Sequence, residues 1–246
     1  MNKMTVKQSV LDAGRISAGN SKMPGSTFAI SALHCKVGGK LAKVKGSVCD
    51  RCYAIKLQKL RPSVNQGWTA NYEKSVGLID KAPNKWIDAC VFQINRHFAK
   101  SQQPYHRWFD SGDLQSVAML KAICGVAERT PDISHWLPTR EAKIVKDYLA
   151  GGGVVPSNLV IRISATMIGD KPVKGYANTS TVHRKDDALT GKECLAYRTD
   201  TTRGLVSEEE FKAARKAKDK SYDFGHCGDC RACWSFDVEN VSYPLH

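Results

Sequence analysis

The sequence has no long apolar run. A membrane-spanning helix needs about 20 mostly apolar residues, and no segment of this chain approaches that length. Residues 1–15 carry charges at Lys3, Lys7, Asp12 and Arg15, and they lack the apolar centre of a signal peptide. We therefore expect a cytoplasmic protein with no membrane partner.

Repeats and low-complexity tracts are also missing, and a complete set of disulfides is excluded. The chain holds nine cysteines, an odd number that would leave one thiol unpaired. A chain of 246 residues with 42% hydrophobic residues buries enough surface to fold without cross-links. In a reducing compartment, closely spaced cysteines indicate metal ligands before disulfides.

Acidic residues are scarce in the first quarter of the chain. Residues 1–61 contain twelve Lys or Arg but only Asp12 and Asp50 as acids, which gives +10 of the total net charge of +13. Such a surplus favours a phosphate-bearing partner, either nucleic acid or a nucleotide. A solvated surface, or positive charge that offsets an anionic cluster, explains it equally well. The sequence carries no indication of oligomeric state.

The first group of cysteines is Cys35, Cys49 and Cys52. The Cys-x-x-Cys pair brings two thiolates together across a tight turn, and a Gly-rich loop separates the pair from Cys35. Three thiolates fit a 4Fe–4S cluster that keeps one iron open. They also fit zinc with a fourth ligand, for which His34 is the candidate.

The second group is Cys227, Cys230 and Cys233, a Cys-x-x-Cys-x-x-Cys run. This run is similar to the first three ligands of a bacterial ferredoxin cluster, whose fourth ligand is distant in the chain. Cys194 is the candidate fourth ligand. Zinc sites more often use pairs than an evenly spaced triplet, so this group favours iron–sulfur. We predict one or two 4Fe–4S clusters on these seven cysteines, and we expect Cys90 and Cys124 to be core residues.

The middle of the chain alternates strands and helices. Strands are predicted at 105–109, 133–137 and 159–164, with helices at 114–129 and from 139 to about 150. This alternation predicts an α/β fold with a parallel sheet, whose chemistry lies at the carboxyl ends of the strands. Those ends are residues 110–113, 138–140 and 164–166.

The flanking regions give weaker patterns. We expect residues 1–25 to be irregular, a short strand at 27–30, a loop from Cys35 to Cys49, and a helix capped by Asp50. Two further helices are expected at about 66–80 and 84–99. Beyond residue 170 one clear helix is expected, starting with the capping box of Ser207 and Glu210. We predict a domain at 1–170 and a cysteine-rich extension at 171–246.

Three segments resemble a known family. Residues 40–54, which end in Cys-Asp-Arg-Cys-Tyr-Ala, residues 108–114, Trp-Phe-Asp-Ser-Gly-Asp-Leu, and the triplet that ends in Trp234 are similar to the phage "gene product eighty-eight"-like proteins. Those proteins are uncharacterised, so the resemblance implies a phage protein in the host cytoplasm and no specific activity.

A wider resemblance is to the radical S-adenosylmethionine (SAM) superfamily. The loop of Cys35, Cys49 and Cys52 resembles its cluster loop, although the spacing here is thirteen and two residues instead of three and two. The resemblance implies a small partial (βα) barrel with a C-terminal cysteine-rich extension. It further implies SAM as a cofactor, with Ser111, Asp113 and Arg162 as polar contacts.

The chain is therefore expected to be an iron–sulfur protein of radical-SAM-like type, with SAM-dependent catalysis as one outcome. The resemblance assigns no catalytic residue. Two alternatives remain: a non-enzymatic iron–sulfur protein that binds nucleic acid or a host factor, and a zinc-stabilised structural protein.

Overall fold

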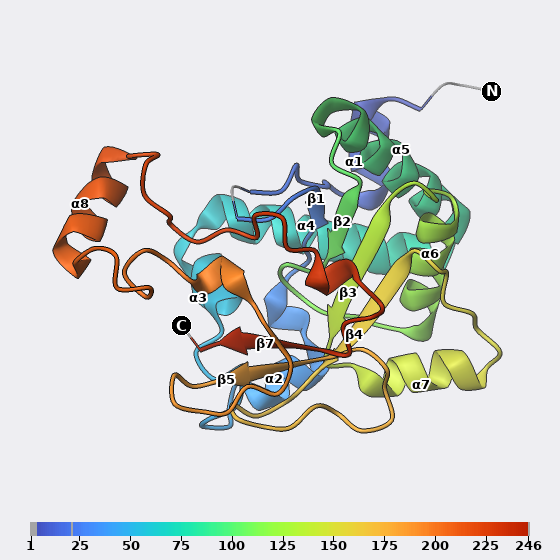
Figure 1. Ribbon diagram of the computed structural model, residues 1–246. Coiled ribbons are helices and arrows are strands. Elements are labelled where there is room, and N and C mark those ends of the chain that lie inside the picture. The colour runs from blue at the N-terminus through green and yellow to red at the C-terminus, as the bar shows by residue number, and fades with distance from the viewer. Residues whose placement is uncertain (1–3, 21, 246) are drawn as a thin grey trace.

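The computed structural model describes residues 4–20 and 22–245 (Figure 1). The longer helices are α1 (Val6–Ala13), α2 (Lys36–Leu41), α3 (Tyr53–Leu60), α4 (Pro62–Ile79), α5 (Pro83–Ser101), α6 (Val117–Glu128), α7 (Ala142–Ala150) and α8 (Glu208–Ala217). Three short 3-10 helices are η1 (Ala32–His34), η2 (Leu195–Tyr197) and η3 (Ala232–Trp234). The strands are β1 (Ser26–Phe28), β2 (Tyr105–Trp108), β3 (Ser134–Thr139), β4 (Leu159–Ser164), β5 (Thr179–His183), β6 (Lys192–Glu193) and β7 (Asn240–Pro244).

The strands form one seven-stranded sheet in the order β1-β2-β3-β4-β5-β7-β6. Every pair of neighbours is parallel. The α/β class and the three central strands are therefore confirmed. Because neighbouring strands in a parallel sheet run in the same direction, the carboxyl ends of β1 to β4 lie at the same edge of the sheet, where the polar loops that follow them can meet.

The two faces of the sheet pack against different segments. On one face, Phe28, Trp108 and Leu137 enter a large core with residues of α5 and α6 such as Trp86. On the other face, Trp136 packs with Met23 and Trp234, the last residue of η3. Side chains alternate between the faces of a strand, so neighbouring residues of β2 and β3 belong to different cores. Figure 1 shows the C-terminal segment with η3 running across β3.

The N-terminal third is more helical than the sequence indicated. Residues 6–13 form α1, which Thr5 caps by accepting a hydrogen bond from the backbone of Gln8. The predicted loop from 35 to 49 contains α2, and Asp50 does not cap the next helix. Cys52 is the residue before α3, while the Asp50 carboxylate accepts from the backbone of Gly46. These expectations were wrong because tertiary contacts outweigh the glycines of α2, and because Asp50 closes its own turn.

Beyond residue 170 the structure adds three strands that the sequence did not indicate. Residues of β5 and β7 are largely polar, so neither strand shows an apolar alternation. Their side chains form hydrogen bonds across the sheet: Ser180 of β5 with Ser164 of β4, and Thr181 and His183 of β5 with Ser242 of β7. These strands extend the same sheet as β1 to β4. Among the described residues, no helix has the length and apolarity to cross a membrane.

Candidate functional site

The first cysteine group lies on segments that cross the carboxyl end of the sheet. Cys35 joins η1 to α2, and Cys52 directly precedes α3. The loop between them is fixed to the segment after β4, because the backbone N–H of Val48 donates to Thr166 at 2.9 Å and that of Ile168 donates to Gly46 at 3.1 Å. The group is therefore held at both ends, near β1 and near β4.

Gly38 lies between two of these thiols. A Cβ built on Gly38 would lie 3.5 Å from the sulfur of Cys49 and 3.8 Å from that of Cys35. The two sulfurs are thus no farther apart than the sum of these distances. Gly39, the next residue of α2, would meet no atom within 4 Å. A Cβ at Gly38 would thus be in contact with both sulfurs and in tight contact, at 3.2 Å, with the Cβ of Cys35, so a larger side chain would fill the space beside these two thiols.

The ends of β2 and β3 provide the polar surroundings of this group. Asp113 is buried and accepts hydrogen bonds from the backbone of Leu114 (2.8 Å), the hydroxyl of Thr139 (2.5 Å) and the backbone of Arg140 (2.9 Å). Burial raises the pKa of Asp113 to about 6, although these hydrogen bonds oppose the rise. Burial also raises the pKa of Cys35, and the charge of Asp113 adds to that rise.

Arg140 balances part of this negative charge. Burial raises the pKa of Cys49, and the guanidinium of Arg140 opposes the effect. The Nε of Arg140 is buried and has no hydrogen-bond partner within the described part of the chain. The buried hydroxyl of Ser111 is likewise unpartnered there. Two polar groups at the strand ends are thus available to a bound molecule.

The turn at Gly112 fixes Ser111 and Asp113. Gly112 has φ +84°, and a Cβ there would lie 2.3 Å from Ile30. The backbone of Ile30 in turn donates to the carbonyl of Ser111 at 3.0 Å. Only glycine tolerates this conformation and contact, so the sequence Ser-Gly-Asp locks the end of β2 against the end of β1.

The second cysteine group converges from two distant segments. Cys194, which follows β6, and Cys227, Cys230 and Cys233 all line one narrow cavity, together with Glu193, Leu195, Ala196, Ala232, Trp234 and Val241. The pKa of the Cys194 thiol rises to about 12, chiefly through burial and then through the charge of Cys233. The proposed fourth position is therefore next to the triplet, although 32 residues lie between Cys194 and Cys227 in the chain.

Arg162 holds the segment that carries Cys233. Its guanidinium is fully buried and donates five hydrogen bonds to backbone carbonyls. The acceptors, at 2.7–3.3 Å, are Cys233, Thr179, Val238, Ala232 and Ser235. A guanidinium has five N–H donors, so all are committed and none is left for a bound molecule. The structure thus gives Arg162 a part in positioning the segment that carries Cys233.

Tyr243 and Arg107 border the second group but were not singled out from the sequence. The hydroxyl of Tyr243 lies 3.1 Å from the sulfur of Cys233. The guanidinium of Arg107 lies 4.7 Å from the centre of the Trp136 ring. Alternation along the strand could have indicated Arg107: its neighbour Trp108 enters the large core, so Arg107 faces the opposite side of the sheet.

The remaining residues considered in the sequence analysis are the two core cysteines and His34. Cys90 and Cys124 are buried in the large core, as expected. His34 stacks on Tyr72 with ring centroids 3.8 Å apart. Within residues 4–20 and 22–245, no three His, Cys, Asp or Glu side chains are gathered closely enough to hold a single metal ion.

The comparisons with known proteins give one result. The family described as Gene product 88 matches residues 2–235, nearly the whole chain, so the chain belongs to that family and its resemblance to these phage proteins is confirmed. No curated protein and no solved structure matches the chain.

Proposed function

We propose that this member of the Gene product 88 family is an iron–sulfur protein of radical-SAM-like type, with one 4Fe–4S cluster on each cysteine group. The observation that supports this proposal best is that the nine cysteines lie in three separate places. Four line one cavity, three lie together at the carboxyl end of the sheet, and two are buried in the core. The four and the three are the numbers of thiolates that a fully bound and an open cluster need.

The donor set fits such clusters. Burial raises the pKa values of the Cys194, Cys227 and Cys233 thiols, and the charges of neighbouring thiolates add to the rise, so positive charge bound between them would stabilise their deprotonated forms. Iron would supply that charge. The thiolates of one zinc ion lie about 3.8 Å apart, given Zn–S bonds of about 2.3 Å. Cluster thiolates bind different iron atoms and stay farther apart, so a cluster does not need its sulfurs gathered around one point.

The order of the strands supports the radical-SAM-like part of the proposal. Strands β1 to β5 are neighbours in chain order and all parallel, which is the arrangement of a (βα) barrel or of part of one. The first group lies at the carboxyl end, where such barrels carry their chemistry. A cluster with an open iron supplies one electron to a bound SAM, and this chemistry belongs to the cofactor.

The chain's own residues would orient that cofactor. Ser111 offers a buried hydroxyl without a partner in the described region, and Arg140 offers a free Nε. Asp113 joins the ends of β2 and β3, so its carboxylate shapes the site through Thr139 and Arg140. Of the three SAM contacts suggested by the sequence, Ser111 retains that part, and Asp113 and Arg162 act by positioning.

The glycine pair of α2 gives the sharpest test. Gly38→Val places carbon against the sulfurs of Cys35 and Cys49, whereas Gly39→Val projects into open space. After anaerobic reconstitution we expect about 8 irons per chain in the unchanged protein and in Gly39→Val, but about 4 in Gly38→Val. Zinc without iron or acid-labile sulfide would refute the proposal. Equal iron contents in Gly38→Val and Gly39→Val would refute the cluster proposed on the first cysteine group, but not the one proposed on the second.

The enzymatic part needs its own assay. Reduction with dithionite and addition of SAM should yield 5′-deoxyadenosine, and Gly38→Val should yield none while its second site stays filled. If the reconstituted protein forms no 5′-deoxyadenosine and SAM leaves its spectrum unchanged, the protein binds clusters without SAM chemistry.

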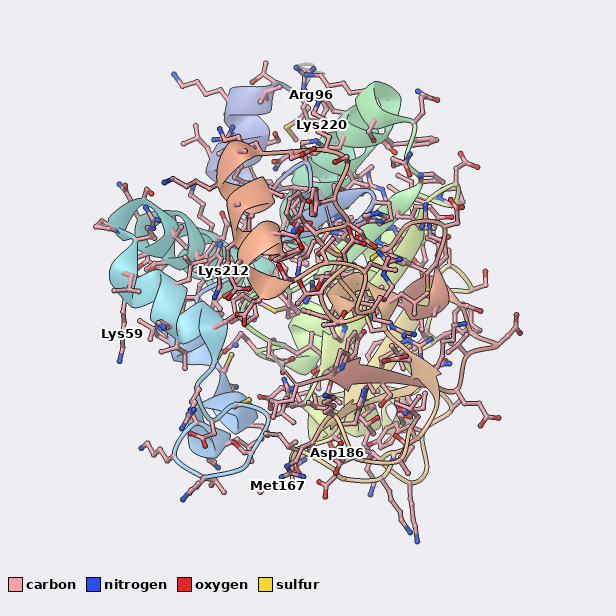
Figure 2. All side chains as sticks on the ribbon, turned by 60° about the vertical axis from the view of Figure 1, so that its left-hand side comes forward. Lys59, Arg96, Met167, Asp186, Lys212 and Lys220 are labelled. Carbon is pink, nitrogen blue, oxygen red and sulfur yellow. The ribbon has the colours of Figure 1, made fainter. Side chains whose placement is uncertain are left out.

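A second candidate function rests on the basic surface around the first group. Eight Lys or Arg side chains of residues 36–61 are exposed: Lys36, Lys40, Lys43, Lys45, Arg51, Lys56, Lys59 and Arg61. Figure 2 shows Lys59 extending outward from α3. None of these eight takes part in an ion pair within the described residues. The surface therefore fits a nucleic acid, held by a non-enzymatic iron–sulfur protein.

Fluorescence anisotropy with a labelled single-stranded oligonucleotide tests this candidate. Binding should weaken steeply with salt, and Lys56→Glu with Lys59→Glu should reduce it. Lys216→Glu with Lys218→Glu, on and just after α8, is the matched control because these side chains are also exposed but lie on a different segment. No binding at low salt would exclude the candidate.

A further inference from the structure

The second cysteine group is surrounded by more than the thiols that a structural cluster needs. We propose, resting on the clusters argued above, that Tyr243 and Arg107 raise the reduction potential of the second centre, so that it takes up an electron before the first centre does. Both side chains come from strands of the sheet, Tyr243 from β7 and Arg107 from β2.

Tyr243 is placed to donate a hydrogen bond to a ligand sulfur. Its hydroxyl lies 3.1 Å from the sulfur of Cys233. A thiolate has no proton to give, so the O–H must then be the donor. Strand β7 lies between β5 and β6 and pairs with both, which fixes the backbone of Tyr243. A hydrogen bond to a ligand sulfur stabilises the reduced, more negative state of a cluster.

Arg107 adds a positive charge on the same face of the sheet. Its guanidinium stacks on Trp136, which packs against Trp234 of the second core. Its Nε is buried without a hydrogen-bond partner in the described part of the chain, and no carboxylate there lies within ion-pair distance of it. Its charge therefore acts on its surroundings, which include the thiols of Cys227 and Cys233.

The acidic groups near the two centres differ. Glu193 lines the second cavity, but Arg198 pairs with it at 3.4 Å. Asp229, next to Cys230, is exposed to water, which screens its charge. Asp110, which follows β2, faces Arg107 without an ion pair, and it lies on the side of Tyr53 and the first group. At the first group the buried carboxylate of Asp113 acts directly on Cys35, and Arg140 opposes only part of its effect, while the surrounding Lys and Arg side chains are exposed and screened by water. Negative charge near a cluster opposes reduction, so the surroundings favour an electron on the second centre.

The cavity strengthens these effects. Its lining is largely apolar and includes Leu195, Val241 and Trp234. In surroundings of low dielectric constant, a nearby charge or hydrogen bond acts more strongly than in water. A cluster that only stabilised the fold would gain nothing from a raised potential, whereas a centre that exchanges electrons would.

An anaerobic redox titration followed by electron paramagnetic resonance tests the proposal. Tyr243→Phe removes the hydroxyl and keeps the ring. We expect it to retain about 8 irons and to lower the midpoint of the second centre only, with about a fivefold fall in its ratio of reduced to oxidised form at a fixed potential. Tyr105→Phe is the matched control, because Tyr105 packs on Trp234 and makes no hydrogen bond to a ligand sulfur.

Arg107→Met provides a second perturbation, and it should also lower the midpoint of the second centre. The proposal is overturned if Tyr243→Phe and Arg107→Met keep their iron without a shift, if Tyr105→Phe shifts equally, or if the first centre is reduced first in the unchanged protein. It is also overturned if both variants lose iron from the second group, since their part is then structural. A protein that assembles no cluster at all would instead refute the proposed function.

Discussion

Replacing Arg162 tests how the segment that carries Cys233 is held against the sheet. Arg162→Met keeps an unbranched stem like that of arginine and removes five donors to the carbonyls of Thr179 and of residues 232–238. A hydrogen bond from a charged donor contributes about 1.5–3 kcal/mol. Five would contribute about 7 kcal/mol or more, but burial of a guanidinium without an acidic partner costs several kcal/mol and lowers its pKa.

We therefore expect a net loss of about 3 kcal/mol, and we expect it to be local. Four of the five acceptor carbonyls belong to residues 232–238, and Phe236 in this segment is 47% exposed, so the segment can open to water without unfolding the sheet. Hydrogen exchange followed by mass spectrometry on the cluster-free protein measures this opening. Exchange in residues 232–238 should accelerate about a hundredfold, while the backbone of β3 keeps its protection.

Arg162→Lys is the matched variant, because lysine keeps the charge but offers three donors without the planar fork, and it should restore only part of the protection. The reasoning is refuted if exchange in residues 232–238 stays unchanged in Arg162→Met. Equal acceleration in β3 would show that Arg162 stabilises the whole fold and not this segment.

Three further predictions follow from other residues. Cys227→Ala should remove about half of the iron, whereas Cys90→Ala should leave the iron near the unchanged value, as measured by colorimetric iron and sulfide assays. Burial lowers the pKa of His135 to about 3, so below about pH 6.5 the unfolded chain binds a proton that the folded chain does not. Its contribution to stability should fall by about 2 kcal/mol between pH 7 and pH 5, and urea unfolding should show a smaller fall in His135→Gln. Asp113 changes stability with pH in the opposite direction. Because its pKa is raised, the folded state keeps the carboxyl proton up to about pH 6. Stability should therefore decrease as the pH rises from about 4 to about 6, and this decrease should be absent in Asp113→Asn.

The central part of the fold could be predicted from the sequence because its signals are local. Leu159-Val-Ile-Arg-Ile-Ser reads as a buried strand, and the structure begins and ends β4 at the same residues. The strands after residue 170 could not be found in this way. Their stability comes from hydrogen bonds between polar side chains of different strands, such as Asn240 with Thr181, and such pairs leave no periodic pattern in one segment.

The sequence by itself determined which cysteines have ligand spacing and which lie on apolar helix faces, since both depend on nearby residues. Cys90 and Cys124 followed that pattern into the core. Only the tertiary structure decided which groups surround each set. It brought Cys194 to the cavity of the triplet and directed Arg162 to the backbone of residues 232–238. It also set Tyr243 against the sulfur of Cys233. Contacts between segments far apart in the chain depend on how the strands pair, and spacing along the chain carries no record of that pairing.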